Sequence, residues 1–168
     1  KHISTVSNWV SYLTDAFLVF QLERFSYKLK QQFIAPKKTY CMDNGIVETI
    51  GFKFSENKGK IIENVVAVEL QRKKSVNGIE IYYWKNIQQN EVDFVLKKKN
   101  KIIKLIQVTY ANSKEELKER EIDSLIKAAK ELRCNNLEIV TFNFEDEEKI
   151  GQYKINFIPL WKWLLTNK

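Results

Sequence analysis

The sequence predicts a mixed α/β fold in which one β-sheet is flanked by helices and follows a smaller helix-and-hairpin unit. The main observation is the order of the apolar segments after residue 58. Two segments have the length and spacing of amphipathic helices, and four shorter ones are typical of strands. In order, the predicted elements are a helix at 59–74, strands at 79–84, 92–97 and 102–110, a helix at 114–132 and a strand at 137–142.

The chain is predicted to divide into a first domain at residues 1–45 and the α/β domain at residues 46–168. In the first domain, Thr5 can cap a helix that runs to about Asp15. The elements predicted after it are a strand at 17–22, a polar bend at 27–32, a return strand at 37–42 and a turn at Asp43-Asn44-Gly45.

A helix followed by a hairpin is the second half of a winged helix, so the first domain is predicted to be a partial winged helix. Such a unit contacts DNA through a helix in a groove and a hairpin near the phosphates. The basic residues placed to do so are Lys28, Lys30, Lys37 and Lys38. The alternative is that the unit only packs domains together, because several elements of a complete winged helix are absent from this sequence.

In the α/β domain, the apolar residues of the first helix spread over a wide arc, which predicts burial on more than one side. The second and third strands are joined by the polar turn Lys98-Lys99-Asn100-Lys101, and residues 153–165 add a short strand and a terminal helix. The order αβββαβ is the core order of the restriction-endonuclease-like fold. Other α/β domains share that order, so it does not identify a function.

Composition excludes several classes of protein and of enzyme. The longest apolar runs are interrupted by charge well before the roughly 20 residues that a membrane-spanning helix needs. Cys41 and Cys134 are too few for a disulfide framework, which agrees with a reducing interior and predicts the cytoplasm. His2 is the only histidine, so a Ser-His-Asp triad and a His metal cluster lack their central member.

The net charge of +7 and the isoelectric point near 9.3 favour an anionic partner such as nucleic acid. Lysine greatly outnumbers arginine, which favours contact with the phosphate backbone over reading of base edges. The alternative is a basic protein from a lysine-rich proteome.

Six short motifs in order carry a family resemblance. They are Lys38 to Gly45, Gly59 to Asn64, Tyr82-Tyr83-Trp84, Glu91-Val92-Asp93-Phe94, Gln107-Val108-Thr109 and Arg120-Glu121-Ile122. This set resembles the C-terminal region of prokaryotic AAA-type ATP-binding proteins, a region similar to the PD-(D/E)XK nuclease superfamily. The resemblance covers most of the chain and implies an ATPase module upstream of Lys1. No ATP site is expected in this chain, because Gly59-Lys60 lacks the other residues of a phosphate-binding loop.

The resemblance implies a nuclease site that binds Mg²⁺ or Mn²⁺. Its helix acid, strand Asp, strand acid and lysine correspond to Glu63, Asp93, Gln107 and Thr109. Gln107 can offer a carbonyl oxygen to a metal but no negative charge. Thr109 cannot replace an ammonium that steadies the attacking water or the developing charge. The predicted site is therefore degenerate, and its phosphodiesterase activity is left open.

Two further acids compete for a place in this site. Glu121 lies between Leu117 and Leu125 on the apolar face of its helix, from which it can supply the acid missing at Gln107. Glu69 lies in the apolar arc of the first helix and competes with Glu63. Ordinary ion pairs are the structural alternative for each.

Strand register gives a test of this site. Asp93 and Gln107 share a face of the sheet when the hairpin loop between their strands has an odd number of residues, and a two-residue turn contradicts a shared site. Two functions remain open: a DNA-associated nuclease-fold module of a larger AAA-type ATPase, and a non-catalytic docking domain that binds a partner protein.

Overall fold

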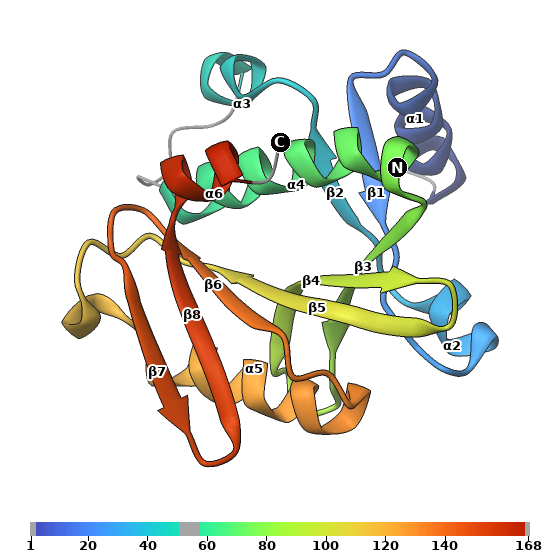
Figure 1. Cartoon of the computed structure of the whole chain (residues 1–168). Helices are drawn as coiled ribbons and strands as arrows, with labels where there is room; N and C mark the ends of the chain where they lie inside the picture. The colour runs from blue at the N-terminus through green and yellow to red at the C-terminus, as the bar shows by residue number, and fades with distance from the viewer. Residues whose placement is uncertain (1–2, 51–57, 167–168) are drawn as a thin grey trace.

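The structure, a computed structural model, describes residues 3–50 and 58–166 (Figure 1). Its centre is a six-stranded mixed sheet in the order β3-β4-β5-β6-β8-β7. These strands are β3 (Ile79–Lys85), β4 (Glu91–Lys98), β5 (Lys101–Val108), β6 (Leu137–Thr141), β7 (Asp146–Ile150) and β8 (Tyr153–Pro159). Pairing is parallel between β5 and β6 and between β6 and β8, and antiparallel elsewhere in this sheet.

Helices cover both faces of this sheet. On one face lie α4 (Lys58–Asn77) and the terminal helix α6 (Leu160–Thr166), and on the other lies α5 (Glu119–Leu132), preceded by a short 3₁₀ turn, η1 (Lys114–Glu116). The order α4-β3-β4-β5-α5-β6 confirms the predicted αβββαβ order and the mixed α/β fold class. No helix in the described ranges is long and apolar enough to span a membrane.

The first part of the chain forms a two-stranded antiparallel sheet that packs beside α4. The elements of this part of the chain are α1 (Ile3–Asp15), β1 (Val19–Leu22), α2 (Leu29–Ile34), β2 (Lys38–Cys41) and α3 (Asn44–Ile50), and β1 and β2 form the sheet. Phe20, Leu22 and Tyr40 join the same core as the apolar residues of α4. This sheet is therefore attached to the α4 side of the larger sheet.

Several local predictions for the first part of the chain are wrong. Thr5 lies inside α1 and not at its cap, and the predicted bend contains the start of α2. The predicted turn at Asn44-Gly45 is the start of α3. The strand begins only at Val19, because Phe17 has a left-handed backbone with φ of 56°.

The prediction also lacks β7, and the reason is its composition. β7 contains three acidic residues and one apolar residue, and it pairs only with β8 at the edge of the sheet. An edge strand with charged side chains needs no apolar alternation, so no such pattern marks it in the sequence.

A β-bulge in β4 determines how the sheet presents its polar residues. Tyr82 pairs with Val95 and Trp84 with Val92. Asp93 and Phe94 of β4 therefore both lie opposite one residue of β3, Tyr83. Val92 and Val95 both pack into the core on the α5 side, whereas Phe94 packs on the α4 side. The extra residue therefore turns Asp93 toward α4, out of the alternation that the rest of the strand follows.

Candidate functional site

An ammonium group lies at the centre of the carboxylates on the α4 side of the sheet. Nζ of Lys38 lies 2.7 Å from Oε1 of Glu91, 2.8 Å from Oδ1 of Asp93 and 3.0 Å from Oε1 of Glu63. The lysine comes from β2, one acid from α4 and two acids from β4. The side chain of Lys38 is only 20% exposed, so this is a largely desolvated contact between the two sheets.

Other groups complete the coordination of these carboxylates. The hydroxyl of Tyr40 donates to Oε1 of Glu63 at 2.7 Å, and Nζ of Lys85 lies 3.0 Å from Oε2 of Glu91. The backbone N–H of Val108 donates to Oδ2 of Asp93 at 3.0 Å. Three carboxylates and two ammonium groups leave this cluster with a formal charge of −1.

Burial and charge act against each other at Lys38 and Asp93. Burial alone would lower the pKa of Lys38, but the adjacent carboxylates of Asp93 and Glu63 hold that pKa well above its ordinary value. Burial raises the pKa of Asp93, and Glu63 adds to the increase, while Lys38 and the Val108 N–H oppose it. Removing Lys38 would therefore leave a buried acid beside another acid, an arrangement that favours protonation or the entry of another cation.

The β4–β5 hairpin gives the result of the register test. Lys98 pairs with Lys101, so the turn has two residues, and Ile103 forms a bulge that shifts the later pairs by one. Extending the pair Phe94–Ile106 by one residue places Gln107 beside Asp93. Ile106 and Val108, on either side of Gln107, pack on the α4 side, so the side chain of Gln107 starts on the α5 face.

Gln107 and Asp93 therefore meet through the main chain and not as two ligands on one face. Oε1 of Gln107 accepts the backbone N–H of Asp93 at 3.3 Å. The expectation of a shared face assumed regular alternation, and the bulge at Asp93 breaks that alternation. Gln107 serves here to satisfy a buried backbone donor where the β4–β5 ladder ends.

Thr109 and Glu121 lie together on the opposite side of the sheet from Lys38. A hydrogen bond from the Thr109 side chain acts on Glu121, whose pKa is nevertheless raised by burial. Oε2 of Glu121 is buried and has no hydrogen-bond partner among the described residues. Glu121 thus does not supply the acid missing at Gln107. Glu69 also lies outside the cluster, since it pairs with Arg72 and Lys73 along α4.

The four lysines predicted to contact DNA have different environments. Lys28 and Lys30 are exposed around the start of α2, whereas Lys37 pairs with Glu23 at 3.2 Å. Lys38 is directed into the carboxylate cluster and away from any phosphate on the surface. Strand alternation predicts that the side chains of Lys37 and Lys38 point to opposite faces. Only the packing of β2 against α4 reveals the partners of Lys38.

The sequence prediction missed three members of the cluster, Glu91, Tyr40 and Lys85. Glu91 lies two residues before Asp93, so its proximity to Asp93 was a usable signal. Among the described residues, no group of three or more His, Cys, Asp and Glu side chains is arranged to hold a metal ion. With Lys38 in this position the residues do not fit a divalent ion, because the ammonium engages the oxygen atoms that such an ion would need.

Comparison with known proteins identifies the family of this chain. Residues 58–163 match the family model described as "Domain of unknown function (DUF4143)", and residues 2–57 match another domain of unknown function, DUF8612. The chain is 41% identical over 167 residues to the uncharacterized protein MJ1544 of Methanocaldococcus jannaschii. The alignment covers 96% of this chain and 36% of that protein, so the chain spans about a third of its relative's length. DUF4143 is a domain found in the C-terminal part of AAA-ATPase-like proteins. Because the DUF4143 model covers more than half of the sequence, this chain belongs to the DUF4143 family.

Proposed function

We propose that this chain is a DNA-associated nuclease-fold module of an AAA-type ATPase that binds DNA without cutting it. The observation that carries the proposal is the position of Lys38, whose ammonium contacts Glu63, Glu91 and Asp93 at 2.7–3.0 Å. A tethered cation thus lies where acids from a helix and a strand converge, the place at which a metal-dependent nuclease would hold its ion.

The chemistry of the neighbouring residues supports binding without cleavage. Hydrolysis of a phosphodiester needs a group that activates water and positive charge that is free to stabilise the phosphorane. The charge of Lys38 is already neutralised by three carboxylates, and Gln107 is bonded to the main chain of Asp93. Thr109 offers no ammonium and lies near Glu121 on the other side.

The test is a parallel measurement of DNA binding and DNA cleavage with Mn²⁺, using single-stranded, duplex and branched substrates. Wild type should bind in a salt-sensitive manner and leave all three substrates intact. Asp93→Asn should retain most of the DNA affinity, since Asp93 makes no surface contact. Mn²⁺-dependent cutting that is lost in Asp93→Asn would overturn the proposal and indicate a working nuclease.

A second candidate function is docking of the domain onto the ATPase module, without a role for DNA. The observation that favours it is the exposure of large apolar side chains at both ends of the β1–β2 sheet: Phe17 at one end, and Phe33 and Ile34 on α2 at the other, at 82%, 69% and 75% exposure. Large apolar side chains that gather at the surface mark interaction sites. The ATPase module is the occupant that fits, since the family is found in AAA-ATPase-like proteins and the M. jannaschii relative is almost three times as long. Wild type that neither binds nor cuts DNA would favour this function.

A further inference from the structure

A second charged surface lies at the far end of β4 from Asp93. Its members are exposed basic residues of the β4–β5 turn and of the end of α5, and we call them the basic end: Lys98, Lys99, Lys101, Lys130 and Arg133. The side-chain amide of Asn136, just after α5, donates to the carbonyl of Ile103 in β5 at 3.2 Å, so the start of β5 and the end of α5 are neighbours. Asp93 lies five residues before Lys98 on β4, which separates the two sites by roughly 17 Å.

The charges of the basic end have no acidic partners in the described part of the chain. Nearby lysines are paired, Lys97 with Glu80 and Lys104 with Glu138, while no ion pair among the described residues involves a member of the basic end. Glu131, the acid between Lys130 and Arg133, instead accepts a hydrogen bond from the indole of Trp84 at 3.1 Å. This end therefore presents positive charge that nothing in the described structure neutralises.

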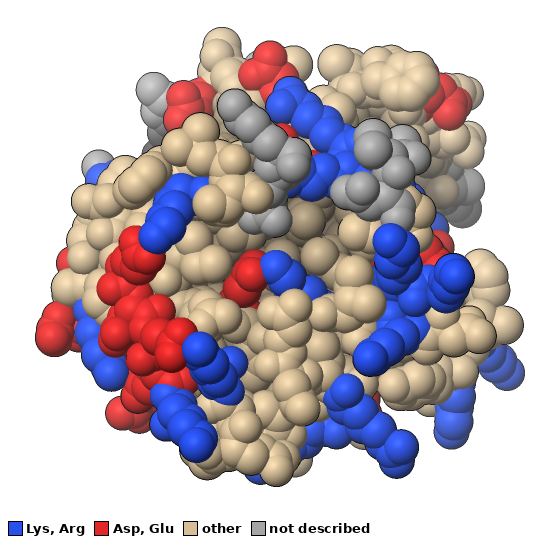
Figure 2. Space-filling model, viewed as in Figure 1, with Lys and Arg blue, Asp and Glu red and all other residues tan. Residues whose placement is uncertain are grey.

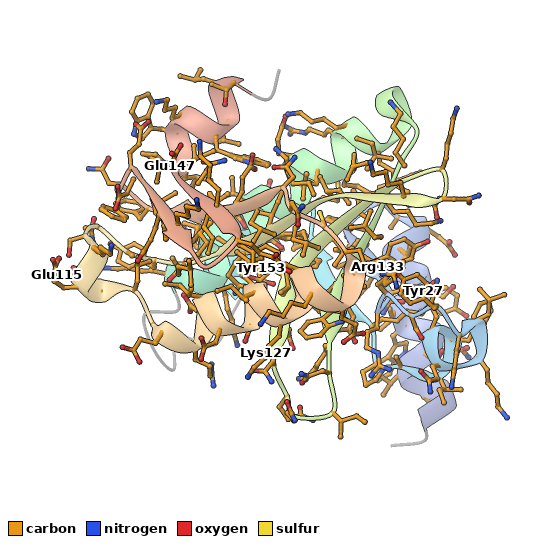
Figure 3. All side chains as sticks on the ribbon, turned by 60° about the horizontal axis from the view of Figure 1, so that its bottom comes forward. Tyr27, Glu115, Lys127, Arg133, Glu147 and Tyr153 are labelled. Carbon is orange, nitrogen blue, oxygen red and sulfur yellow. The ribbon has the colours of Figure 1, made fainter. Side chains whose placement is uncertain are left out.

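Acidic residues gather on the other side of the molecule. Figure 2 shows a red patch over β7 and separate blue side chains toward the β4–β5 turn and α2. The labelled acids Glu115 and Glu147 lie at one side in Figure 3, and Arg133 lies toward the other, at the end of α5. An anion approaching the molecule is thus directed toward the basic end.

The hairpin carries a like-charge pair at its turn. Lys98 and Lys101 are directly paired across the two strands. Like charges in directly opposed positions destabilise a hairpin, and an acid at either position would stabilise it. Stability of the hairpin alone does not explain two lysines here.

Two left-handed backbone positions also carry cations. Lys99 has φ of 55° in the turn and Arg133 has φ of 52° as the C-cap of α5. Glycine or asparagine is the favoured residue at such positions, because a Cβ is crowded there. Phe17 and Gln89 have the same backbone conformation elsewhere, but Lys99 and Arg133 are cations and both lie in the basic end. Backbone cost retained in this way is typical of functional positions.

We propose that the basic end binds the phosphate backbone of duplex DNA. This inference rests on the proposed function and adds which surface makes the contact. Lysine side chains on a turn suit phosphate contact without base reading. The predicted wing, with Lys28, Lys30 and Lys37, is then a minor contributor, and the carboxylate cluster lies away from the bound DNA.

The experiment compares two variants that each remove three positive charges. The turn variant is Lys98→Gln with Lys99→Gly and Lys101→Gln. Lys99→Gly suits the left-handed backbone, so the turn variant should retain its thermal stability. The matched control alters the predicted wing and is Lys28→Gln with Lys30→Gln and Lys37→Gln.

Affinity of the full chain is measured by fluorescence anisotropy with a labelled duplex of mixed sequence at several salt concentrations. The turn variant should bind at least about tenfold more weakly at low salt. Its slope of log affinity against log salt should fall by about 0.9 for each phosphate that the variant no longer neutralises. The control variant should show a much smaller decrease in both quantities.

The outcomes separate the two proposals. Equal losses in the two variants, or a larger loss in the control, would overturn the assignment of the basic end while leaving DNA binding in place. A wild-type chain that does not bind the duplex would overturn the proposed function and this inference together. Wild type that binds phosphatidylserine vesicles but not the duplex, with the turn variant losing the vesicle binding, would assign the basic end to a lipid surface and overturn the inference.

Discussion

At the scale of single residues, Lys38 determines the state of the carboxylate cluster. Lys38→Met keeps the length of the side chain and removes the charge, which leaves Glu63, Glu91 and Asp93 without their shared cation. We expect the free energy of unfolding to fall by up to about 3 kcal/mol, as when one partner of a buried ion pair is removed. We also expect Mn²⁺ to raise the melting temperature of this variant, because the freed carboxylates can bind it.

The controls for this prediction are a neighbour and a double variant. Lys37→Met removes a cation that pairs with Glu23 outside the cluster, and Mn²⁺ should leave the melting temperature of this variant unchanged. Lys38→Met combined with Asp93→Asn should lose the response to Mn²⁺. A folded Lys38→Met protein without any response to Mn²⁺ would show that Lys38 does not occupy a cation position.

Glu121 gives a prediction about pH. Burial raises its pKa above the ordinary value of 4.5, so the folded chain holds this proton more tightly than the unfolded chain does. Its contribution to stability is therefore greatest at acidic pH and declines as pH rises above 4.5. Glu121→Gln should gain about 1 kcal/mol relative to wild type between acidic and neutral pH. The exposed Glu119→Gln, on the same helix, should show no such gain in denaturant unfolding at the two pH values.

At the scale of elements, Asn64 attaches β2 to α4. Its Oδ1 accepts the N–H of Cys41 at 2.9 Å, and its Nδ2 donates to the carbonyl of Cys41 and to Oδ1 of Asn44, both at 2.7 Å. Asn64→Ala should lower the free energy of unfolding by about 2 kcal/mol. In hydrogen exchange, the amide of Cys41 should lose more protection than the amides of β6. Asn44→Ala removes only one of these bonds and should have a smaller effect, and a uniform loss over all strands would contradict a local role.

The elements show what the sequence could predict and where prediction failed. Apolar spacing predicted α4, β3, β4, β5, α5 and β6 in order, because a buried sheet and its helices require continuous apolar faces. The site depends on a bulge at Asp93, which changes the face of one residue and leaves no mark in the apolar pattern. The partners of Lys38 come from elements 25 and 55 residues away, so no local pattern predicts them.

At the scale of the whole molecule, two exposed surfaces differ in the kind of side chain that they present. The basic end presents cations, whereas α1 and α2 present apolar side chains. The predicted wing assigned four lysines to one DNA-contacting unit, because charge and periodicity do not reveal which side chains lack a partner. The structure separates these lysines, since Lys38 lies in the carboxylate cluster and Lys37 pairs with Glu23. Lys28 and Lys30 remain exposed beside the apolar side chains of α2.

Replacing Phe17 and Phe33 tests whether these exposed rings serve association with a partner and not folding of the chain. Phe17 has φ of 56° and is 82% exposed, so Phe17→Gly relieves a crowded backbone and removes apolar area that contributes little to the core. With Phe33→Ser on α2, we expect a melting temperature within about 3 °C of wild type, since surface substitutions rarely change stability by more than about 0.5 kcal/mol. Association of the chain with an added AAA-type ATPase module, measured by sedimentation velocity, should weaken in the variant. A matched change on another exposed aromatic residue, Trp161→Ser on α6, should leave association as in wild type. A large loss of stability in the Phe17–Phe33 variant would instead show that these rings support the fold, and the docking function would lose its observation.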